Sequence, residues 1–461
     1  MSRSAAVRGG WIAGVAAGLV ALGCAREPGR PDILLVTIDT LRADHCSAYG
    51  YGRPTTPRLD ALARAGVLFE TAYAPMATTA PAHATMFTGL LPLWHGLVKN
   101  GYVLAPGHRR IAAALAEGGY RTGAVVGSFA LDHRFGLATG FASYDDRFSG
   151  RDPSMTTPSW EGHAVVGGAF DRRADETRER AVEWLRAHGY LEPGPARGRP
   201  PFFLWVHFFD PHRPYDPPAA HRELFPPAGR DPLDAEIAAY DGEIHYADAQ
   251  LGLLLDALRD AGRLERTLTM VTADHGEGLM QHGHMEHGLH IYEEAVRVPF
   301  VVHWPAALAA RRLDGPVQVA DVGPTLAAVA GLSWTEAPGQ GRSLSDVLRG
   351  RAEPDGRREV FLQRRRYDEP LAGGRVVKGQ QYALRAGPWK YIESREEGTY
   401  ELYDLRGDPR EQTNLLSAAP AEASSLPGRL ARFVRSAPAP AAQPAVGEEE
   451  ARKLRSLGYV Q

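Results

Sequence analysis

The sequence predicts an α/β fold in which helices flank a doubly wound, mostly parallel sheet. Short, uninterrupted apolar runs rich in branched residues recur through the first 303 residues, and longer segments with a helical apolar period separate them. Strands that are buried on both faces of a parallel sheet have such runs, and the alternation of the two patterns is typical of α/β domains. Beyond about residue 345 the runs become shorter and more polar, which predicts a small C-terminal antiparallel sheet.

Each predicted element follows from a local pattern. The strands of the large sheet are predicted at 32–38, 122–126, 202–209, 268–272 and 298–303. Helices are predicted between them at 58–65, 110–117, 175–188 and 234–262. In the last of these helices, apolar residues recur at alternating steps of three and four, which places them on one face. Four strands of the smaller sheet are predicted at 360–363, 381–386, 389–393 and 400–404.

The N-terminal residues predict export. Two arginines precede an apolar run over 11–22, which is too short to cross a membrane comfortably. The pair Gly23-Cys24 resembles the bacterial lipoprotein cleavage box, although Ala21 stands where that box usually has leucine. Cys24 is therefore the predicted lipidation site, which would attach the protein to a bacterial cell envelope membrane. An uncleaved anchor and ordinary secretion into the periplasm remain alternatives.

Composition divides the chain into four parts. A signal peptide over 1–24 precedes a large α/β domain over 31–345, a small α+β subdomain over 355–435, and a tether with a short terminal helix over 436–461. The net charge of -3 provides no basic field, so a nucleic-acid partner is not expected. If Cys24 is lipidated, Cys46 is the only remaining thiol and no internal disulfide can form.

Acidic and histidine side chains follow three of the predicted strands. Asp39 closes the first strand, Asp274 and His275 follow the strand at 268–272, and Asp210 and His212 follow the strand at 202–209. Ligands of doubly wound sheets bind beyond the carboxyl ends of the strands. Carboxylates and imidazoles gathered there can hold a divalent cation. An isolated aspartate at such a position would more commonly cap a turn, but three clusters favour a metal site.

Thr79 lies just before Pro81 and a short helical segment. A hydroxyl at a helix N-terminus lies beside unpaired backbone N–H groups, which favour a bound anion. On this pattern alone, a helix cap is the more common role for such a threonine.

The segment from Thr79 to Gly89 resembles the sulfatase signature, in which Cys, any residue, Pro, Ser and Arg precede a helix and a Thr-Gly turn. Thr79, Ala82 and His83 occupy the positions of the Cys, Ser and Arg. Continued to Asn100, the segment also resembles the nucleophile region of nucleotide pyrophosphatase/phosphodiesterases, which use an unmodified threonine. Further matches to the sulfatase frame are the motifs IDTLRADH, ADHGEG, YEE with RVP, and LYDL. The chain from 31 to 416 thus resembles sulfatase-like hydrolases of the alkaline phosphatase superfamily.

This resemblance implies a metal-dependent nucleophile. Asp39, Asp274 and His275 would bind the metal together with Thr79, which would be the catalytic nucleophile. Asn100 would stabilise negative charge on the transferred group. Two aspartate oxygens and one histidine nitrogen favour zinc or manganese, with calcium as an alternative.

The resemblance also implies substrate contacts and a second metal position. His212 and His287 match positions that contact the anion or the leaving group, and His83 would contact substrate. In relatives with two ions, Asp210, His212 and a later histidine such as His287 could bind the second, so one or two divalent ions are expected.

The departures from the sulfatase pattern bear on the reaction. Formylglycine is made from cysteine or serine, so Thr79 cannot become it. Thr40 stands at the position of a second metal aspartate, and Ser128 at the position of a lysine. The favoured function is therefore hydrolysis of phosphoric monoesters or diesters through a covalent threonine intermediate. The alternatives are a sulfuric ester hydrolase, a phosphoryl-group transferase acting on envelope lipid or glycan, and an inactive binding lipoprotein.

Overall fold

The computed structural model describes residues 29–149, 170–192, 198–335, 340–367, 377–418 and 420–439. The predicted signal peptide, Cys24 and the predicted terminal helix lie outside these residues. Within them, no helix combines the length and the apolar character needed to cross a bilayer.

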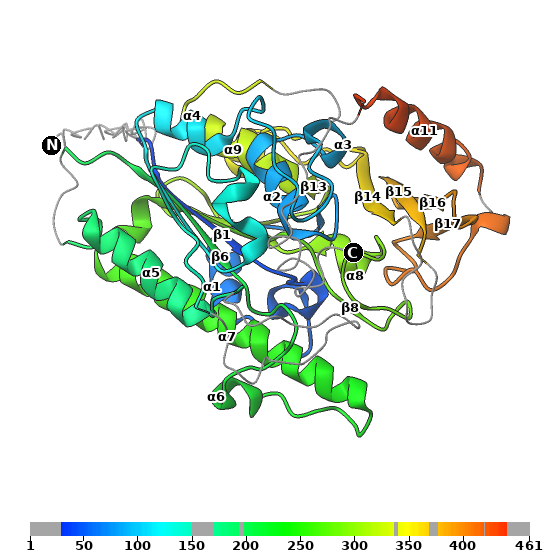
Figure 1. The fold of residues 1–461 in the computed structure, drawn as a ribbon, viewed down its shortest axis with the longest axis horizontal. Coiled ribbons are helices and arrows are strands. Elements are labelled where there is room, and N and C mark those ends of the chain that lie inside the picture. Colours follow the sequence, from blue (N-terminus) through cyan, green and yellow to red (C-terminus); the bar gives the residue numbers. More distant parts are fainter. Residues whose placement is uncertain are drawn as a thin grey trace, which may run out of the picture.

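An eight-stranded sheet forms the centre of the molecule, in the order β12-β2-β11-β7-β1-β6-β4-β5 (Figure 1). Its strands are β1 (Asp32–Ile38), β2 (Val67–Phe69), β4 (Arg121–Val126), β5 (Ser143–Asp145), β6 (Phe202–Phe208), β7 (Thr267–Ala273), β11 (Phe300–His303) and β12 (Arg311–Leu313). The neighbours β7, β1, β6, β4 and β5 are all parallel. Their carboxyl ends therefore meet at one edge of the sheet. This arrangement confirms the predicted fold class.

β1 lies between two parallel neighbours because its whole sequence, DILLVTI, can be buried. All seven residues are buried, and Leu34 is level with Leu204 of β6 and Thr269 of β7. Only a strand without polar exposure on either face is stable in this position.

The strand predicted at 298–303 is divided in the structure. Pro299 separates β10 (Arg297–Val298) from β11, because proline has no N–H to donate to a ladder. β10 joins β3 (Ala72–Tyr73) and β13 (Val317–Gln318) in a small separate sheet. β11 runs antiparallel to both β7 and β2, so one side of the large sheet departs from parallel order.

Helices cover both faces of the sheet (Figure 1). One face carries α1 (Pro57–Ala65), α5 (Ala174–Ala187) and α7 (Pro232–Asp260), and the other carries α2 (Thr79–Thr88), α4 (Ile111–Glu117) and α9 (Val322–Val329). The Asp231 carboxylate caps α7 by accepting the N–H of Leu233 at 2.9 Å, and Pro232 occupies the first turn. The remaining helices are α3 (Pro92–His95), α6 (Ala219–Arg222), α8 (Glu293–Val296), α10 (Ser345–Leu348) and α11 (Leu426–Ser436).

The predicted C-terminal sheet is present beside the main sheet (Figure 1). It is antiparallel, with strands β14 (Val360–Tyr367), β15 (Gly379–Ala386), β16 (Trp389–Ser394) and β17 (Thr399–Asp404) in chain order. The fully buried Lys390 of β16 pairs with Glu293 of α8 at 3.0 Å and with Glu411 at 2.9 Å. This buried ion pair ties the small sheet to the segment that follows β7. The domain boundaries given above stay a prediction.

Candidate active site

Three ligand side chains converge where β1 and β7 end. Asp39 follows β1, and Asp274 and His275 follow β7. One ligand atom from each lies within 4.8 Å of the others, and all three side chains are fully buried. The Nε2 atom of His275 lies 3.8 Å from Asp39 Oδ1 and 3.6 Å from Asp274 Oδ2. Because β1 and β7 are parallel neighbours, the sheet itself produces this convergence.

The polar atoms of this cluster fit a divalent cation. Among the described residues, neither oxygen of Asp39 has a hydrogen-bond partner, nor has Asp274 Oδ2. Burial, and then the charge of Asp274, raises the pKa of Asp39 well above its usual value. His275 Nδ1 must donate to the carbonyl of Gly276 at 2.9 Å, so Nε2 is the nitrogen available to a cation. Unpaired buried carboxylates are costly, and a cation would relieve that cost.

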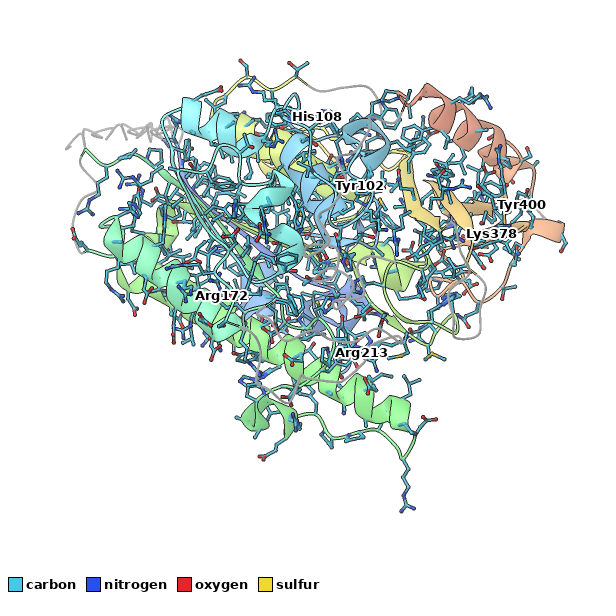
Figure 2. All side chains as sticks on the ribbon, in the orientation of Figure 1. Tyr102, His108, Arg172, Arg213, Lys378 and Tyr400 are labelled. Atoms are coloured by element: carbon cyan, nitrogen blue, oxygen red, sulfur yellow. The ribbon has the colours of Figure 1, made fainter. Side chains whose placement is uncertain are left out.

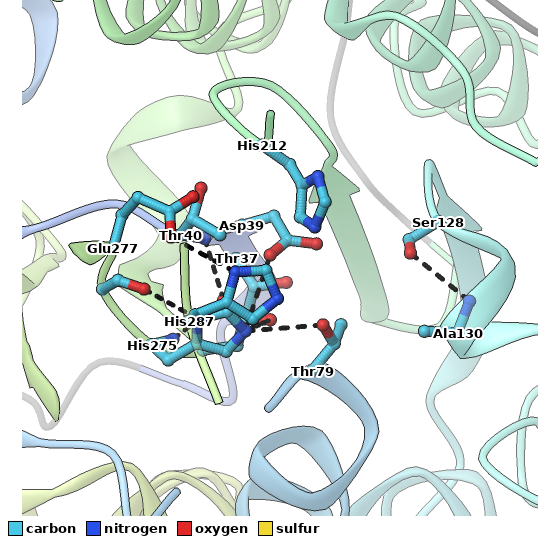
Figure 3. Close-up of polar contacts among 12 residues, drawn as sticks. Thr37, Asp39, Thr40, Thr79, Ser128, Ala130, His212, His275, Glu277 and His287 are labelled. Carbon is cyan, nitrogen blue, oxygen red and sulfur yellow. Dashed lines mark hydrogen bonds and ion pairs between the residues drawn. The ribbon is translucent and has the colours of Figure 1, made fainter. Parts of the chain in front are cut away.

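Thr79 is the first residue of α2 and is fully buried. Its hydroxyl oxygen lies 3.5 Å from His275 Nε2, at the edge of the cluster (Figure 3). Asn100 accepts the N–H of Ala80 at 2.8 Å through its Oδ1 atom. The Nδ2 group of Asn100 is buried without a partner in the described part of the chain. The helix N-terminus and this amide therefore provide donors suited to an anion.

A row of histidine rings extends from the cluster. The ring of His287 is centred 4.5 Å from that of His275 and 5.0 Å from that of His212. Glu277 accepts from His287 Nδ1 at 3.3 Å and from the hydroxyl of Tyr215 at 3.2 Å. Burial lowers the pKa of His287, but the Glu277 carboxylate outweighs it and raises this pKa to about 9. His287 is thus a cation at neutral pH.

His83 faces inward, beneath the first turn of α2. Its Nδ1 atom contacts the carbonyl oxygen of Thr79 at 2.8 Å, and its Nε2 atom contacts the Thr37 hydroxyl at 3.0 Å. Burial lowers the pKa of His83 to about 3, so the ring is neutral. Both ring nitrogens are engaged, and the predicted substrate contact of His83 has no geometric support.

Asp210 lies apart from the cluster. Its Oδ2 atom accepts the N–H of Ala174 at 2.7 Å, at the start of α5. Of the described residues, only two groups gather three or more ligand atoms: the cluster above, and a partly exposed set of Asp132, His133 and Asp146. Asp210, His212 and His287 belong to neither group. The geometry therefore supports one metal position rather than the second one expected from two-metal relatives.

Ser128 also lies apart, with its hydroxyl facing Ala130 (Figure 3). It accepts the N–H of Ala130 at 3.3 Å and so caps a turn after β4. Arg213, labelled in Figure 2, lies in the loop after β6. Its guanidinium pairs with Glu236 of α7 at 3.5 Å and with Glu286 at 2.6 Å. The Glu286 residue belongs to β9 (Met285–Glu286), which pairs with β8 (Gly278–Leu279).

His207 is a residue of the site that sequence patterns did not single out. It lies on β6, fully buried, with Nε2 3.4 Å from Asp39 Oδ2. The available signal was an imidazole within an otherwise apolar strand, level with Thr37 on β1.

The comparisons with known proteins agree with this geometry. A family model described as Sulfatase matches residues 31–332, which is more than half of the chain. The chain belongs to the sulfatase family. A second model, described as N-sulphoglucosamine sulphohydrolase, C-terminal, matches residues 281–430 of this family member. The family, with the fold described above, confirms an ester hydrolase of the alkaline phosphatase superfamily.

Relatives of this sulfatase-family protein include both sulfatases and a phosphonate hydrolase. Arylsulfatase A of Homo sapiens is 27% identical, with 84% of this chain and 83% of that protein covered. An arylsulfatase of Clostridium perfringens is 24% identical, with coverage of 84% and 91%. The phosphonate monoester hydrolase structure of Agrobacterium radiobacter is 26% identical, with a TM-score of 0.69 and coverage of 88% and 95%.

Proposed function

We propose that the protein hydrolyses phosphoric monoesters or diesters through a covalent intermediate on Thr79. The observation that carries this proposal is the unmodified threonine at the start of α2, with its hydroxyl 3.5 Å from His275. The β-methyl group of threonine prevents its conversion to the aldehyde of formylglycine. A hydroxyl nucleophile next to a cation site remains suited to phosphoryl transfer.

The proposed reaction has two steps. The Thr79 oxygen attacks phosphorus and loses its proton to solvent, while the ester oxygen leaves with its bonding electrons and takes a proton from His287 or His212. Water then attacks phosphorus and gives one proton to the histidine that lost one, while the bond from phosphorus to the Thr79 oxygen breaks and this oxygen takes a proton from solvent. Free phosphate departs, or a phosphate monoester when the substrate was a diester. Asn100 and the N-terminus of α2 donate hydrogen bonds to the transferred group in both steps.

A divalent cation held by Asp39, Asp274 and His275 would neutralise charge on the transferred group and lower the pKa of the Thr79 hydroxyl. Zinc and manganese suit this donor set better than calcium, which prefers oxygen ligands. The unpaired atoms of the cluster support the binding of one ion.

Two features of the relatives bear on the substrate. The phosphonate monoester hydrolase of Agrobacterium radiobacter acts, as its name states, on a phosphorus-centred ester and covers most of this chain. Two relatives that align with 84% of this chain are named arylsulfatases, so a sulfuric ester is the second candidate substrate. A location in the bacterial envelope and lipidation of Cys24 belong to the proposal and rest on residues 1–24 alone.

A paired assay separates the two ester classes. Purified protein lacking residues 1–24 is given an aryl phosphate, an aryl phosphodiester, an aryl phosphonate monoester and an aryl sulfate, each with zinc, manganese or calcium. The matched variants are Thr79→Val, which removes the hydroxyl at constant shape, and Thr79→Ser, which keeps it.

We expect turnover of a phosphorus ester that Thr79→Val abolishes and Thr79→Ser partly retains. Sulfate turnover that dominates with the same dependence on the hydroxyl would establish the second candidate instead. Absence of turnover with every substrate and metal would favour a transferase or a binding protein. Turnover that survives in Thr79→Val would show that Thr79 is not the nucleophile.

A further inference from the structure

We propose that an ion pair between Arg213 and Glu286 positions His212 and His287 for the protonation of the leaving group. This inference rests on the ester hydrolysis proposed above and specifies which residues hold its two candidate proton donors together. Arg213 and Glu286 are positioning residues, since each acts through the histidine next to it in the sequence.

The two histidines come from separate parts of the fold. His212 lies in the loop after β6, and His287 follows β9 of the β8–β9 hairpin. Their rings are centred 5.0 Å apart and meet edge to face at 70° (Figure 3). A proton donor contributes only within hydrogen-bonding reach of the leaving oxygen. The positions of both rings therefore depend on how the β6 loop is held against the hairpin.

Each ring is oriented by a contact close to it in the sequence. His212 Nδ1 lies 2.6 Å from the carbonyl oxygen of Arg213, which can only accept, so Nδ1 is the donor. His287 Nδ1 contacts Glu277 at 3.3 Å. These contacts limit rotation of each ring. The separation of the two rings is set by a contact between the loop and the hairpin.

The residue after His212 and the residue before His287 make that contact. Arg213 pairs with Glu286 at 2.6 Å, and the two side chains are 29% and 13% exposed. Water screens an ion pair at the open surface. This pair is mostly enclosed, so its attraction is screened much less. One ion pair thus joins the neighbours of both histidines, and its loss would let the two rings separate.

The backbone of Glu286 gives a second reason to assign a function to this pair. Its φ angle is 69°, in the left-handed region that is unfavourable for glutamate. Residues persist there only where the surrounding structure holds them, and they concentrate at functional sites. Gly278 lies opposite Glu286 in the hairpin, where a Cβ atom would be 2.6 Å from the Glu286 carbonyl oxygen. The hairpin therefore accommodates this conformation immediately before His287.

A second carboxylate beside Arg213 supplies a matched control. Glu236 of α7 lies 3.5 Å from the guanidinium, and its side chain is 41% exposed. It belongs to neither of the segments that carry the histidines. Loss of Glu236 would therefore remove a negative charge beside Arg213 without releasing the hairpin from the β6 loop.

The dependence of the rate on the leaving group tests the positioning role. A 4-nitrophenyl ester has a weakly basic leaving oxygen that needs little protonation, whereas a phenyl ester needs more. We expect Arg213→Met and Glu286→Gln each to lower kcat/KM about tenfold or more with the phenyl ester but less than about threefold with the 4-nitrophenyl ester. The ester is that of the anion which the wild type hydrolyses.

The double variant and the control complete this comparison. The double variant should lose no more activity than the weaker of the two single variants, because one ion pair is removed in each case. Glu236→Gln should match the wild type with both esters. Equal losses with the phenyl and 4-nitrophenyl esters would overturn the proposal, since a general disturbance of the site affects both.

A second measurement needs neither substrate nor activity. Because the two rings meet edge to face, their carbon-bound protons should give a nuclear Overhauser effect in protein labelled only at histidine. We expect this signal in the wild type and in Glu236→Gln, and its loss in Arg213→Met and Glu286→Gln. His212→Gln and His287→Gln assign it.

The variants at the ion pair should remain folded, because the hydroxyl of Tyr215 still joins the β6 loop to Glu277 at 3.2 Å. A signal of wild-type strength in Arg213→Met would reject the positioning role. If the signal disappears as expected but the wild type hydrolyses no ester, the proposed function fails while the positioning of the two rings is confirmed.

Discussion

The two halves of the Asn100 amide are used differently. The oxygen holds the first turn of α2 by accepting from Ala80, and the buried NH₂ group keeps its hydrogens unpaired in the described part of the chain. A group that is buried with an unused donor destabilises the protein, and this cost is compensated when an anion binds. The two Asp39 oxygens are also buried without hydrogen-bond partners in the described part of the chain, and a bound cation would compensate this cost.

Asn100→Asp tests the use of this donor. The aspartate keeps the oxygen that accepts from Ala80 but replaces the NH₂ group with a negative oxygen. We expect kcat/KM to fall about 100-fold or more with the preferred ester, the size of effect seen on loss of one oxyanion donor. The midpoint of thermal unfolding should fall as well, because the new carboxylate is buried without a partner, so kcat/KM is measured well below that midpoint. A kcat/KM value close to that of the wild type would exclude Asn100 from contact with the transferred group.

At the residue scale, the central residues of the candidate site could be predicted because each of them follows the end of a strand. Asp39, Asp274 and His275 follow buried strands, and the structure gathers them. The direction in which a side chain points was not predictable, because Asp210 follows a strand in the same way but caps α5. His207 escaped prediction because an imidazole within a strand is more commonly a structural core residue than part of a functional site.

Among the elements, the segment after β7 depends on close contact with the C-terminal end of α8. Gly276 donates its N–H to the carbonyl of Ala295 at 2.8 Å, and Glu277 donates to that of Glu294 at 3.0 Å. A Cβ atom on Gly276 would collide with the carbonyl oxygen of Glu294. Because Gly276 has no side chain, the backbone approaches α8 closely, and this approach sets the positions of His275 and Glu277.

Gly276→Ala should therefore affect both stability and metal binding. We expect the free energy of unfolding to fall by about 1–3 kcal/mol, the usual cost of overpacking a dense interior, and zinc affinity to fall with it. Gly107→Ala is the control, because a Cβ atom there meets no atom within 4 Å. Urea unfolding and zinc titration of both variants check the prediction. Equal behaviour of the two variants would contradict the close contact.

Element positions were predicted better than strand directions. The run DILLVTI at 32–38 coincides with β1, since continuous apolar runs mark strands buried on both faces. The same kind of run at 298–303 gave no sign that β11 is antiparallel, because direction depends on the connection rather than on the strand's own residues. Helix α11 was not predicted, although Leu426, Leu430 and Phe433 recur at helical spacing and pack on the small sheet.

At the scale of the whole molecule, His282 and Glu294 connect the catalytic domain to the C-terminal segment. His282 Nδ1 contacts Glu294 at 2.6 Å, and its Nε2 atom contacts the carbonyl oxygen of Glu411 at 3.1 Å. Burial alone would raise the pKa of Glu294. The hydrogen bond from His282 and the nearby ring of His290 outweigh that effect and lower the pKa to about 2. The same carboxylate raises the pKa of His282 against the effect of burial.

These shifts define a pH window for stability. The depressed pKa of Glu294 contributes stability that is present above about pH 4.5 and is lost as the pH falls toward 2. The raised pKa of His282 contributes stability that is complete below about pH 6.5 and is lost as the pH rises through the folded-state pKa.

Glu294→Gln should remove both contributions. We expect the variant to be less stable than the wild type by about 2 kcal/mol near pH 5.5, with a difference that shrinks at pH 3 and at pH 9. Urea unfolding at these three pH values measures it. A difference that is independent of pH would show that the pair is not ionised in the folded protein.

The buried pair of Lys390 with Glu293 and Glu411 also bears on the order in which the protein is made. The metal cluster and Thr79 lie within the first 275 residues, but the second carboxylate for Lys390 is added only at residue 411. A nascent chain between these two points already holds every member of the metal cluster. Once residue 390 is added, it also holds the Lys390 ammonium, whose Glu411 partner is still missing. A chain that ends between residues 390 and 411 would therefore leave this ammonium with one carboxylate partner instead of two, so the contact between the small sheet and the segment after β7 is complete only when residue 411 is present.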